Sequence, residues 1–217
     1  MRHKMAANEI ISTSRISRNK EEKKKRIISK AMELFHKLGF NKTTMEQIAE
    51  EADISKGTLY NYFPIKEAII DEYIKDCFRK KYPERIRHLQ KMPDTQSRIV
   101  LVINEIVEEV QAQNEIYERH IVYTIQKITS LKRDEQINIG FELLAAEIIR
   151  LGQKEEEIRK DLPINTLVGL IEFAFIQVVQ QFYMDPDNFN ALEITNRYVD
   201  LCINGAKEAT KSNYGKD

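Results

Sequence analysis

Cysteine, glycine and proline are all scarce in this chain of 217 residues. The two cysteines, Cys77 and Cys202, lie far apart and form no CxxC pair, which excludes a disulfide-built scaffold and a zinc module made of cysteines. Seven glycines and five prolines are too few for a β fold with many tight turns. With 42% apolar and 31% charged residues, the composition is that of a globular protein rich in helix formers.

Long apolar runs are missing as well. Glu172 and Gln177 interrupt the best candidate before it reaches the roughly 18 residues that a membrane span needs. The amino terminus carries charges but no apolar stretch followed by small residues, so we expect no secretory signal. These observations predict a soluble cytoplasmic protein with no membrane partner.

Motifs of the common catalytic and metal sites are also absent. The sequence contains no glycine-rich phosphate loop, no GxSxG and no HExxH. Glu33 and His36 form one ExxH, but a di-iron bundle needs a second ExxH and two further inward glutamates. A Ser-His-Asp triad has no signature in sequence alone. We therefore expect no catalytic residues, no metal and no cofactor, and keep a helical-bundle enzyme or a helical adaptor as the alternative functions.

The formal net charge is zero, but the charges are unevenly distributed. Residues 1–92 hold 21 basic and 13 acidic side chains, whereas the remaining residues hold 13 and 21. A basic amino-terminal part beside an acidic carboxyl-terminal part suits a nucleic-acid-binding head on a separate body. Patches of solvated helix surface would give the same asymmetry, so both interpretations stay open on charge alone.

The spacing of apolar residues predicts an all-α fold of about nine helices. Residues 1–19 show no periodicity and are expected to form a disordered basic tail, which either reaches a minor groove or is only solvated. From Lys20 one helix is predicted, which Gly39 ends as a C-cap; its apolar stripe is Ile27, Ala31, Leu34, Phe35 and Leu38. Longer helices are predicted at residues 66–89, 96–111, 115–129, 134–153, 164–184 and 189–208.

Between the first helix and residue 66 lie two short helices joined by a tight turn. Two overlapping capping boxes are available for the first of them, Thr43 with Glu46 or Thr44 with Gln47, and the sequence does not choose between them. Ser55 is a good N-cap for the second. Two helices of about two turns with a tight turn between them are typical of a helix-turn-helix.

The second of these helices presents a polar face. Lys56 and Tyr60 stand one turn apart, as do Gly57 and Asn61, while Leu59 points to the opposite side. A helix amino terminus favours phosphate oxygens, and glycine lets the backbone come close to a base. Lysine donates to guanine or to phosphate, and tyrosine donates to phosphate. The face therefore suits a helix that enters the major groove of DNA by its first turn.

The stretch GFNKTTMEQIAEEADISKGTLYNYFPIK at residues 39–66 resembles the TetR family of bacterial transcriptional repressors. The resemblance rests on SKGTLYNYF followed by Lys66 and Glu67, on an amphipathic helix ending in GF, and on a TT-x-x-x-IA helix, and it covers roughly residues 24–70. GQKEEEIRKDLP at residues 152–163 is similar to the family's usual connection into its dimerisation helices. One departure is Asp53, in a turn where the family most often has glycine; Asp tolerates the left-handed conformation better than most residues.

The resemblance implies that ten residues bind DNA: Thr43, Thr44, Ser55, Lys56, Gly57, Thr58, Tyr60, Asn61, Tyr62 and Lys66. Lys56 and Gly57 would read bases, while Tyr60 and Lys66 would hold phosphates. Asn61 lies where side chains vary and set sequence preference. The two threonines at 43 and 44 would touch the edge of the groove, with helix capping as their alternative role, and the tyrosine at 62 either holds a phosphate or packs.

The resemblance also implies a helix-turn-helix DNA-binding domain at residues 20–66 and a helical effector-binding and dimerisation domain at residues 67–217. Residues 164–184 are apolar nearly all round, and residues 189–208 carry two apolar stripes. Such helices fit an isologous interface, so we expect a homodimer through the last two helices. A monomer that buries both helices internally is the alternative.

An effector pocket in the body is expected to be lined by Tyr117, His120, Tyr123, Phe141, Glu172 and Phe173. Glu172 lies among apolar neighbours and needs a partner if it is buried. In the alternative interpretation these aromatic residues are core, and Glu172 lies at a wet edge or pairs with an arginine. The sequence thus predicts a sequence-specific repressor that a small, largely apolar or cationic effector, not identified further, releases from a palindromic double-stranded operator.

Overall fold

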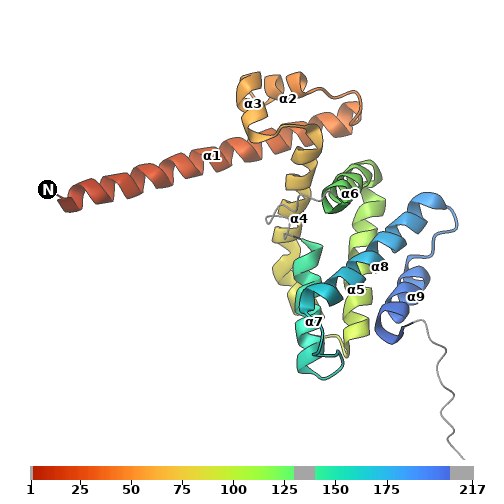
Figure 1. The fold of residues 1–217 in the computed structure, drawn as a ribbon. Helices are drawn as coiled ribbons and strands as arrows, with labels where there is room; N and C mark the ends of the chain where they lie inside the picture. The colour runs from red at the N-terminus through yellow and green to blue at the C-terminus, as the bar shows by residue number, and fades with distance from the viewer. Residues whose placement is uncertain (1, 130–139, 206–217) are drawn as a thin grey trace, which may run out of the picture. The chain divides into compact units, whose positions relative to one another are not determined.

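The computed structural model describes residues 2–129 and 140–205. Every regular element among them is an α-helix (Figure 1), which confirms the predicted all-α fold. The contacts divide the described residues into two compact units. The first holds the chain up to Cys77 together with the helix that follows Asn114; the second holds Phe78 to Asn114 and the residues from Gly140 onward. The domain boundaries at residues 19 and 66 stay predictions.

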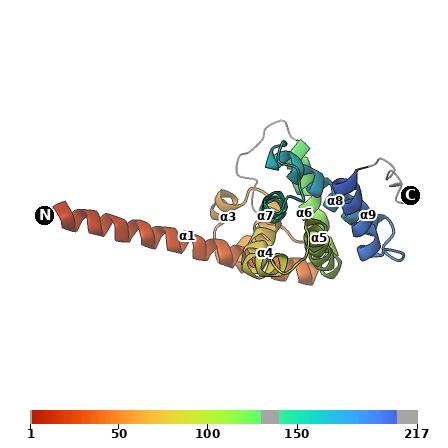
Figure 2. The same ribbon diagram turned by 90° about the horizontal axis from the view of Figure 1, so that it is seen from below.

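The first unit is built around three amino-terminal helices. These are α1 (Arg2–Leu38), α2 (Met45–Glu51) and α3 (Lys56–Tyr62). The amino-terminal part of α4 (Lys66–Leu89) and α6 (Asn114–Thr129) complete it (Figure 2). Most of the predicted apolar stripe of α1 is buried, with Leu38 as the exception at 36% exposure. The other helices contribute buried side chains that are fully enclosed, namely Ile48, Leu59 and Ile69.

Helix α1 begins much earlier than the sequence suggested. Its first residue is Arg2, whereas the sequence predicted a helix only from Lys20. The predicted disordered tail at residues 1–19 stays a prediction. No glycine or proline precedes Gly39, so nothing interrupts the helix once it has formed. Figure 1 shows this amino-terminal part of α1 extending well beyond α2 and α3.

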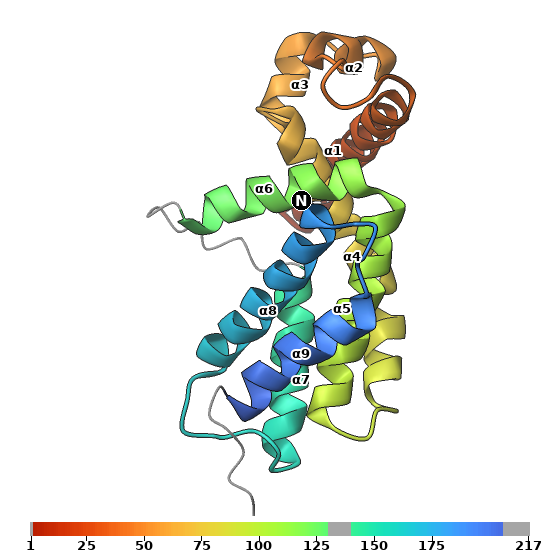
Figure 3. The same ribbon diagram turned by 90° about the vertical axis from the view of Figure 1, so that its right-hand side faces the viewer.

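The second unit combines the carboxyl-terminal part of α4 with α5 (Thr95–Ala112), α7 (Phe141–Lys154), α8 (Ile164–Met184) and α9 (Ala191–Asn204). Helix α8 packs against α7 and α9, and α5 packs against α7 and α9 (Figure 3). The predicted bounds of α4 and α8 agree with the structure, and those of α5 and α6 agree to within one residue. Residues 134–139 and 206–208 of two predicted helices lie outside the described residues.

Polar contacts close the second unit where the α4–α5 turn meets the α7–α8 connection. Arg98 is only 4% exposed; its guanidinium donates to two carbonyl oxygens of the turn and forms an ion pair with Glu155. Thr95 donates its backbone N–H and its hydroxyl to the carboxylate of Glu157, each at 2.6 Å. Gly152 lies directly against Thr95, with no space for a side chain. These contacts fasten the 152–163 segment to α5.

Helix α8 is apolar around much of its circumference. Its length and composition would allow it to cross a membrane, so the expectation that Glu172 and Gln177 exclude this is wrong on those criteria. Core helices of soluble proteins meet the same criteria. One side of α8 is buried in the second unit, through Leu167, Val168, Ile171, Ala174, Val178, Val179 and Phe182. We therefore interpret α8 as a core helix with an apolar outward face.

Candidate nucleic-acid interface

Side-chain caps fix the beginnings of α2 and α3. The hydroxyl of Thr44 accepts the N–H of Gln47 at 3.1 Å, and the side-chain oxygen of Gln47 accepts the N–H of Thr44 at 2.8 Å. This reciprocal pair is a capping box, and it decides between the two boxes that the sequence offered. The hydroxyl of Ser55 accepts the N–H of Thr58 at 3.2 Å, which confirms Ser55 as the N-cap of α3.

The turn between the two helices depends on Asp53. Its φ is +50°, in the left-handed region that the sequence led us to expect for this residue. Helix α2 ends directly before Asp53 with Ala52 as its C-cap, whose N–H donates to the carbonyl of Ile48 at 3.0 Å. Ile54 donates to the carbonyl of Ala49, also at 3.0 Å. The turn therefore forms without the glycine that is usual in the resembling family.

Helix α3 presents the predicted polar face to solvent. Lys56, Gly57 and Asn61 are exposed, and the Tyr60 side chain is 47% exposed. Leu59 on the opposite side is completely buried and anchors the helix to the first unit. The arrangement of this face is confirmed, and its contacts with DNA stay a prediction.

An acidic neighbour beside this face was not predicted from the sequence. Glu46 on α2 lies 3.5 Å from the ammonium of Lys56 on α3. The pKa of Glu46 is lowered, first because its carboxylate accepts its own backbone N–H and then because of the positive charge of Lys56. A negative charge therefore accompanies the cation that is predicted to read a base.

Two of the predicted DNA-binding residues point inward. Thr43 is 1% exposed, and its hydroxyl donates to the carbonyls of Gly39 and Leu34 at 2.9 and 3.3 Å. In this conformation its side chain reaches no groove, because it is enclosed by the first unit. Lys66 donates its ammonium to the carbonyls of Phe40 and Thr43, each at 2.7 Å. Burial lowers the pKa of Lys66.

The remaining two DNA-binding candidates are neither fully exposed nor buried. Thr58 and Tyr62 are each half-buried on α3. The hydroxyl of Thr58 shares a hydrogen bond of 2.8 Å with that of Ser55. Because capping already occupies this pair of hydroxyls, the exposed polar face of α3 consists of Lys56, Gly57, Tyr60 and Asn61. We call these four residues the predicted reading face.

The six candidate effector residues are divided between the two units. Tyr117, His120 and Tyr123 belong to α6 in the first unit, where Tyr117 is buried and His120 lies 3.6 Å from the carboxylate of Asp71. In the second unit, Phe141 stacks on Phe175 with 4.8 Å between ring centroids. The last two occupy α8, with Glu172 half-buried and Phe173 57% exposed. Their role as an effector site stays a prediction.

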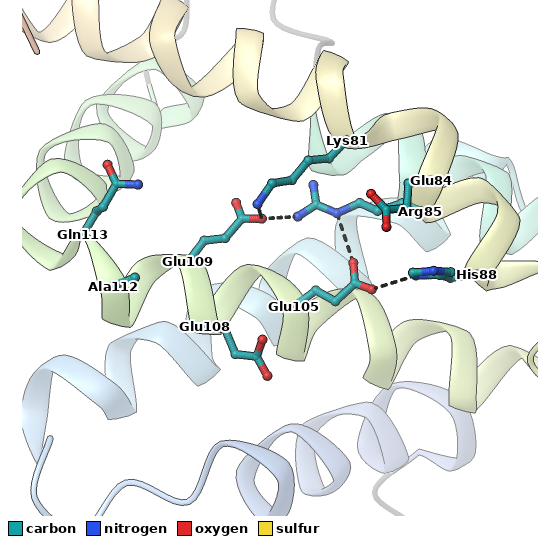
Figure 4. Close-up of a pocket in the computed structure, with 9 residues that line it drawn as sticks. All are labelled: Lys81, Glu84, Arg85, His88, Glu105, Glu108, Glu109, Ala112 and Gln113. Carbon is teal, nitrogen blue, oxygen red and sulfur yellow. Dashed lines mark hydrogen bonds and ion pairs between the residues drawn. The ribbon is translucent and has the colours of Figure 1, made fainter.

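A cavity of about 380 Å³ lies between α4 and α5 (Figure 4). Its lining is polar and contains none of the six effector candidates: Lys81, Glu84, Arg85, His88, Glu105, Glu108, Glu109, Ala112 and Gln113. At its centre Arg85, 3% exposed, donates to Glu105 at 3.1 Å and to Glu109 at 2.6 Å. The sequence did carry a signal for this buried arginine, since it follows the apolar Phe78 by seven residues on one face of α4.

Residues 27–73 match the family model described as "Bacterial regulatory proteins, tetR family". The matched segment contains the whole helix-turn-helix and the exposed face of α3. This segment is a TetR-family DNA-binding domain. The chain is accordingly a DNA-binding transcriptional regulator.

Two curated relatives are HTH-type transcriptional regulators whose similarity to this chain extends beyond that segment. The transcriptional repressor KstR2 of Rhodococcus jostii is 22% identical over 195 residues, which cover 86% of this chain and 92% of KstR2. The regulator YuxN of Bacillus subtilis is 29% identical over 129 residues. The match covers 57% of this chain and less than half, 44%, of YuxN.

Solved structures of TetR-family proteins share the fold. FadR of Thermus thermophilus, a TetR-family repressor solved with lauroyl-CoA, superposes with a TM-score of 0.73 at 21% identity, covering 89% of this chain and 100% of FadR. FadR of Bacillus subtilis, solved with stearoyl-CoA, has a TM-score of 0.61 at 19% identity and covers 84% and 98% of the two chains. At these identities the likeness concerns the helical architecture.

Proposed function

We propose that this TetR-family regulator is a repressor that binds a palindromic operator as a homodimer, with α3 of each copy in the major groove. The observation that carries the proposal is the exposed face of α3. Lys56, Gly57, Tyr60 and Asn61 together offer a cation, an accessible backbone, a phenol and an amide. A face of this kind can donate to base edges and to phosphates at the same time.

The outward faces of α8 and α9 support dimerisation through the last two helices. Large apolar side chains remain exposed on both helices, with Leu170 at 47%, Phe173 at 57%, Leu192 at 58% and Leu201 at 46%. Exposed apolar side chains on adjacent helices mark an interaction surface. A second copy of the chain offers the same surface, which suits a two-fold symmetric contact between four helices.

Long-chain acyl thioesters of coenzyme A are the first effector class to test. Two solved relatives of the same fold contain such ligands, lauroyl-CoA in one and stearoyl-CoA in the other. The aromatic pair Phe141 and Phe175 offers apolar surface in the second unit for an acyl chain. A bound acyl thioester would favour a state of the dimer with lower operator affinity, and operator and effector would weaken each other by the same factor.

Selection of bound duplexes from a random library tests the DNA-binding proposal. The recovered sites should be palindromic, with half-sites about one helical turn or more apart, and binding should weaken steeply with salt. Lys56→Ala should cost about 1–3 kcal/mol and relax the preference at one base pair, whereas Tyr60→Phe should weaken all sequences alike. Adding stearoyl-CoA should release the selected duplex. A chain that enriches no sequence at low salt would refute the proposal and favour a helical adaptor.

A further inference from the structure

Phe40 occupies a central place in the first unit. Gly39, with φ at +83°, turns the chain out of α1, and the ring of Phe40 then packs against Phe35 with 5.1 Å between centroids. Phe40 is 3% exposed. Because the chain has left α1, the buried N–H of Phe40 needs an acceptor from another part of the fold.

Helix α6 supplies that acceptor. The carboxylate of Glu115 accepts the N–H of Phe40 at 3.1 Å, although the two residues are 75 positions apart. A hydrogen bond to a carboxylate is roughly twice as strong as one between neutral groups. One turn further along α6, the guanidinium carbon of Arg119 lies 5.4 Å from the centroid of the Phe40 ring, within cation–π range.

Helix α4 holds the other side of the same residue. The ammonium of Lys66 donates to the carbonyls of Phe40 and Thr43 and lies 4.3 Å from the Phe40 ring centroid. The pKa of Lys66 is lowered by burial, and the neighbouring positive charge of Arg119 adds to this. An ammonium has three donors, and two of those of Lys66 are directed at backbone carbonyls.

We propose that Lys66, Glu115 and Arg119 are positioning residues that clasp Phe40 and thereby hold the helix-turn-helix against α4 and α6 of the first unit. We call the three residues and Phe40 the Phe40 clasp. The inference deepens the proposed function and rests on it for its effect on DNA binding.

Hydrogen exchange of the full-length protein without DNA tests the clasp directly. In Glu115→Ala the Phe40 amide should exchange about tenfold faster or more, while the amide of Ile48 keeps its wild-type rate. Glu115→Gln retains an acceptor oxygen and should restore part of the protection. Glu118→Ala, an exposed position on the same helix, is the matched control and should change neither amide. An unchanged Phe40 amide in Glu115→Ala would overturn the clasp.

Salt dependence distinguishes positioning by Lys66 from phosphate binding. With the duplex recovered by selection, Lys66→Met should lower affinity about threefold to tenfold at every salt concentration and leave the slope of log K against log salt unchanged. Lys66→Arg keeps donors for the two carbonyls and should regain affinity. A slope reduced by about one per subunit would show that Lys66 binds phosphate and would overturn its role in the clasp. If no duplex binds the wild type, the proposed function fails, whereas the exchange experiment still decides the clasp.

Discussion

The ammonium of Lys56 on α3 and the carboxylate of Glu46 on α2 lie 3.5 Å apart across the helix-turn-helix. Both side chains are on the surface, 65% and 48% exposed. The pair partly neutralises the cation that is predicted to read a base. In the proposed complex, Lys56 would exchange this ion pair for a contact with DNA, and the carboxylate of Glu46 would repel the phosphates.

Removing the charge of Glu46 should strengthen DNA binding. Glu46→Gln is expected to raise affinity for the selected duplex about twofold to fivefold at low salt, because exposed ion pairs are weak and the freed Lys56 gains a DNA partner. Titrations at two salt concentrations measure the change. Glu50→Gln, an exposed position on the same helix, is the charge-matched control and should have the smaller effect. Equal gains in both variants would show a general charge effect.

The buried arginine of the α4–α5 cavity should matter more for stability than its exposed neighbour. Arg85→Ala leaves Glu105 and Glu109 without their buried partner and should lower the free energy of unfolding by about 3–5 kcal/mol. Lys81, 51% exposed, also pairs with Glu109, and Lys81→Ala should cost only about 0.2–1 kcal/mol. Urea unfolding of both variants gives the comparison. Similar losses would show that the network is solvated.

Two glycines should respond in opposite ways to alanine. A Cβ at Gly152 would lie 2.7 Å from Ile158 Cγ1 and closer still to Thr95 Oγ1, so Gly152→Ala should lower stability by about 1–3 kcal/mol. A Cβ at Gly57 meets nothing within 4 Å. Gly57→Ala should therefore keep or raise stability by up to about 1 kcal/mol while weakening DNA binding, since the methyl group stands on the predicted reading face. Thermal unfolding and DNA titration together measure both effects.

The N-cap of α5 should contribute to the acid sensitivity of the fold. Asp94 accepts the N–H of Ser97 at 2.7 Å, and this hydrogen bond lowers the pKa of its carboxyl group. A lowered folded-state pKa means that the stabilisation is present above the unfolded pKa of about 3.9 and is lost as pH falls through the folded value. Asp94→Asn keeps an acceptor that does not titrate, so its Tm should fall less than that of the wild type between pH 6 and pH 2.5.

Asp94→Ala provides the control for the cap itself. It should lower stability by about 0.5–2 kcal/mol at neutral pH, where the wild type and the asparagine variant are expected to be similar. If the Tm of the wild type and that of Asp94→Asn fall equally as the pH is lowered, the acid sensitivity comes from other carboxylates.

Interactions between residues close in the sequence were sufficient to predict the structure of the helix-turn-helix. Ser55 as an N-cap, Asp53 in a left-handed turn and the outward face of α3 depend on neighbours within about four residues, so the sequence contains their causes. The bounds of α4 and α8 were predictable for the same reason, because apolar spacing and flanking prolines act locally. The start of α1 at Arg2 was not predicted, because residues 2–19 show no amphipathic pattern.

Only the tertiary structure decided which of the predicted DNA-binding groups are exposed and which bind other parts of the protein. Thr43 and Thr44 are adjacent and chemically identical, yet one is enclosed and the other caps α2 in solvent. Lys66 matched a phosphate-binding position, but its ammonium is held by the Phe40 carbonyl on a turn 26 residues away. The partner of the Phe40 N–H lies 75 positions along the chain. Contacts between such distant segments depend on how the helices pack, and neither periodicity nor local propensity encodes that packing.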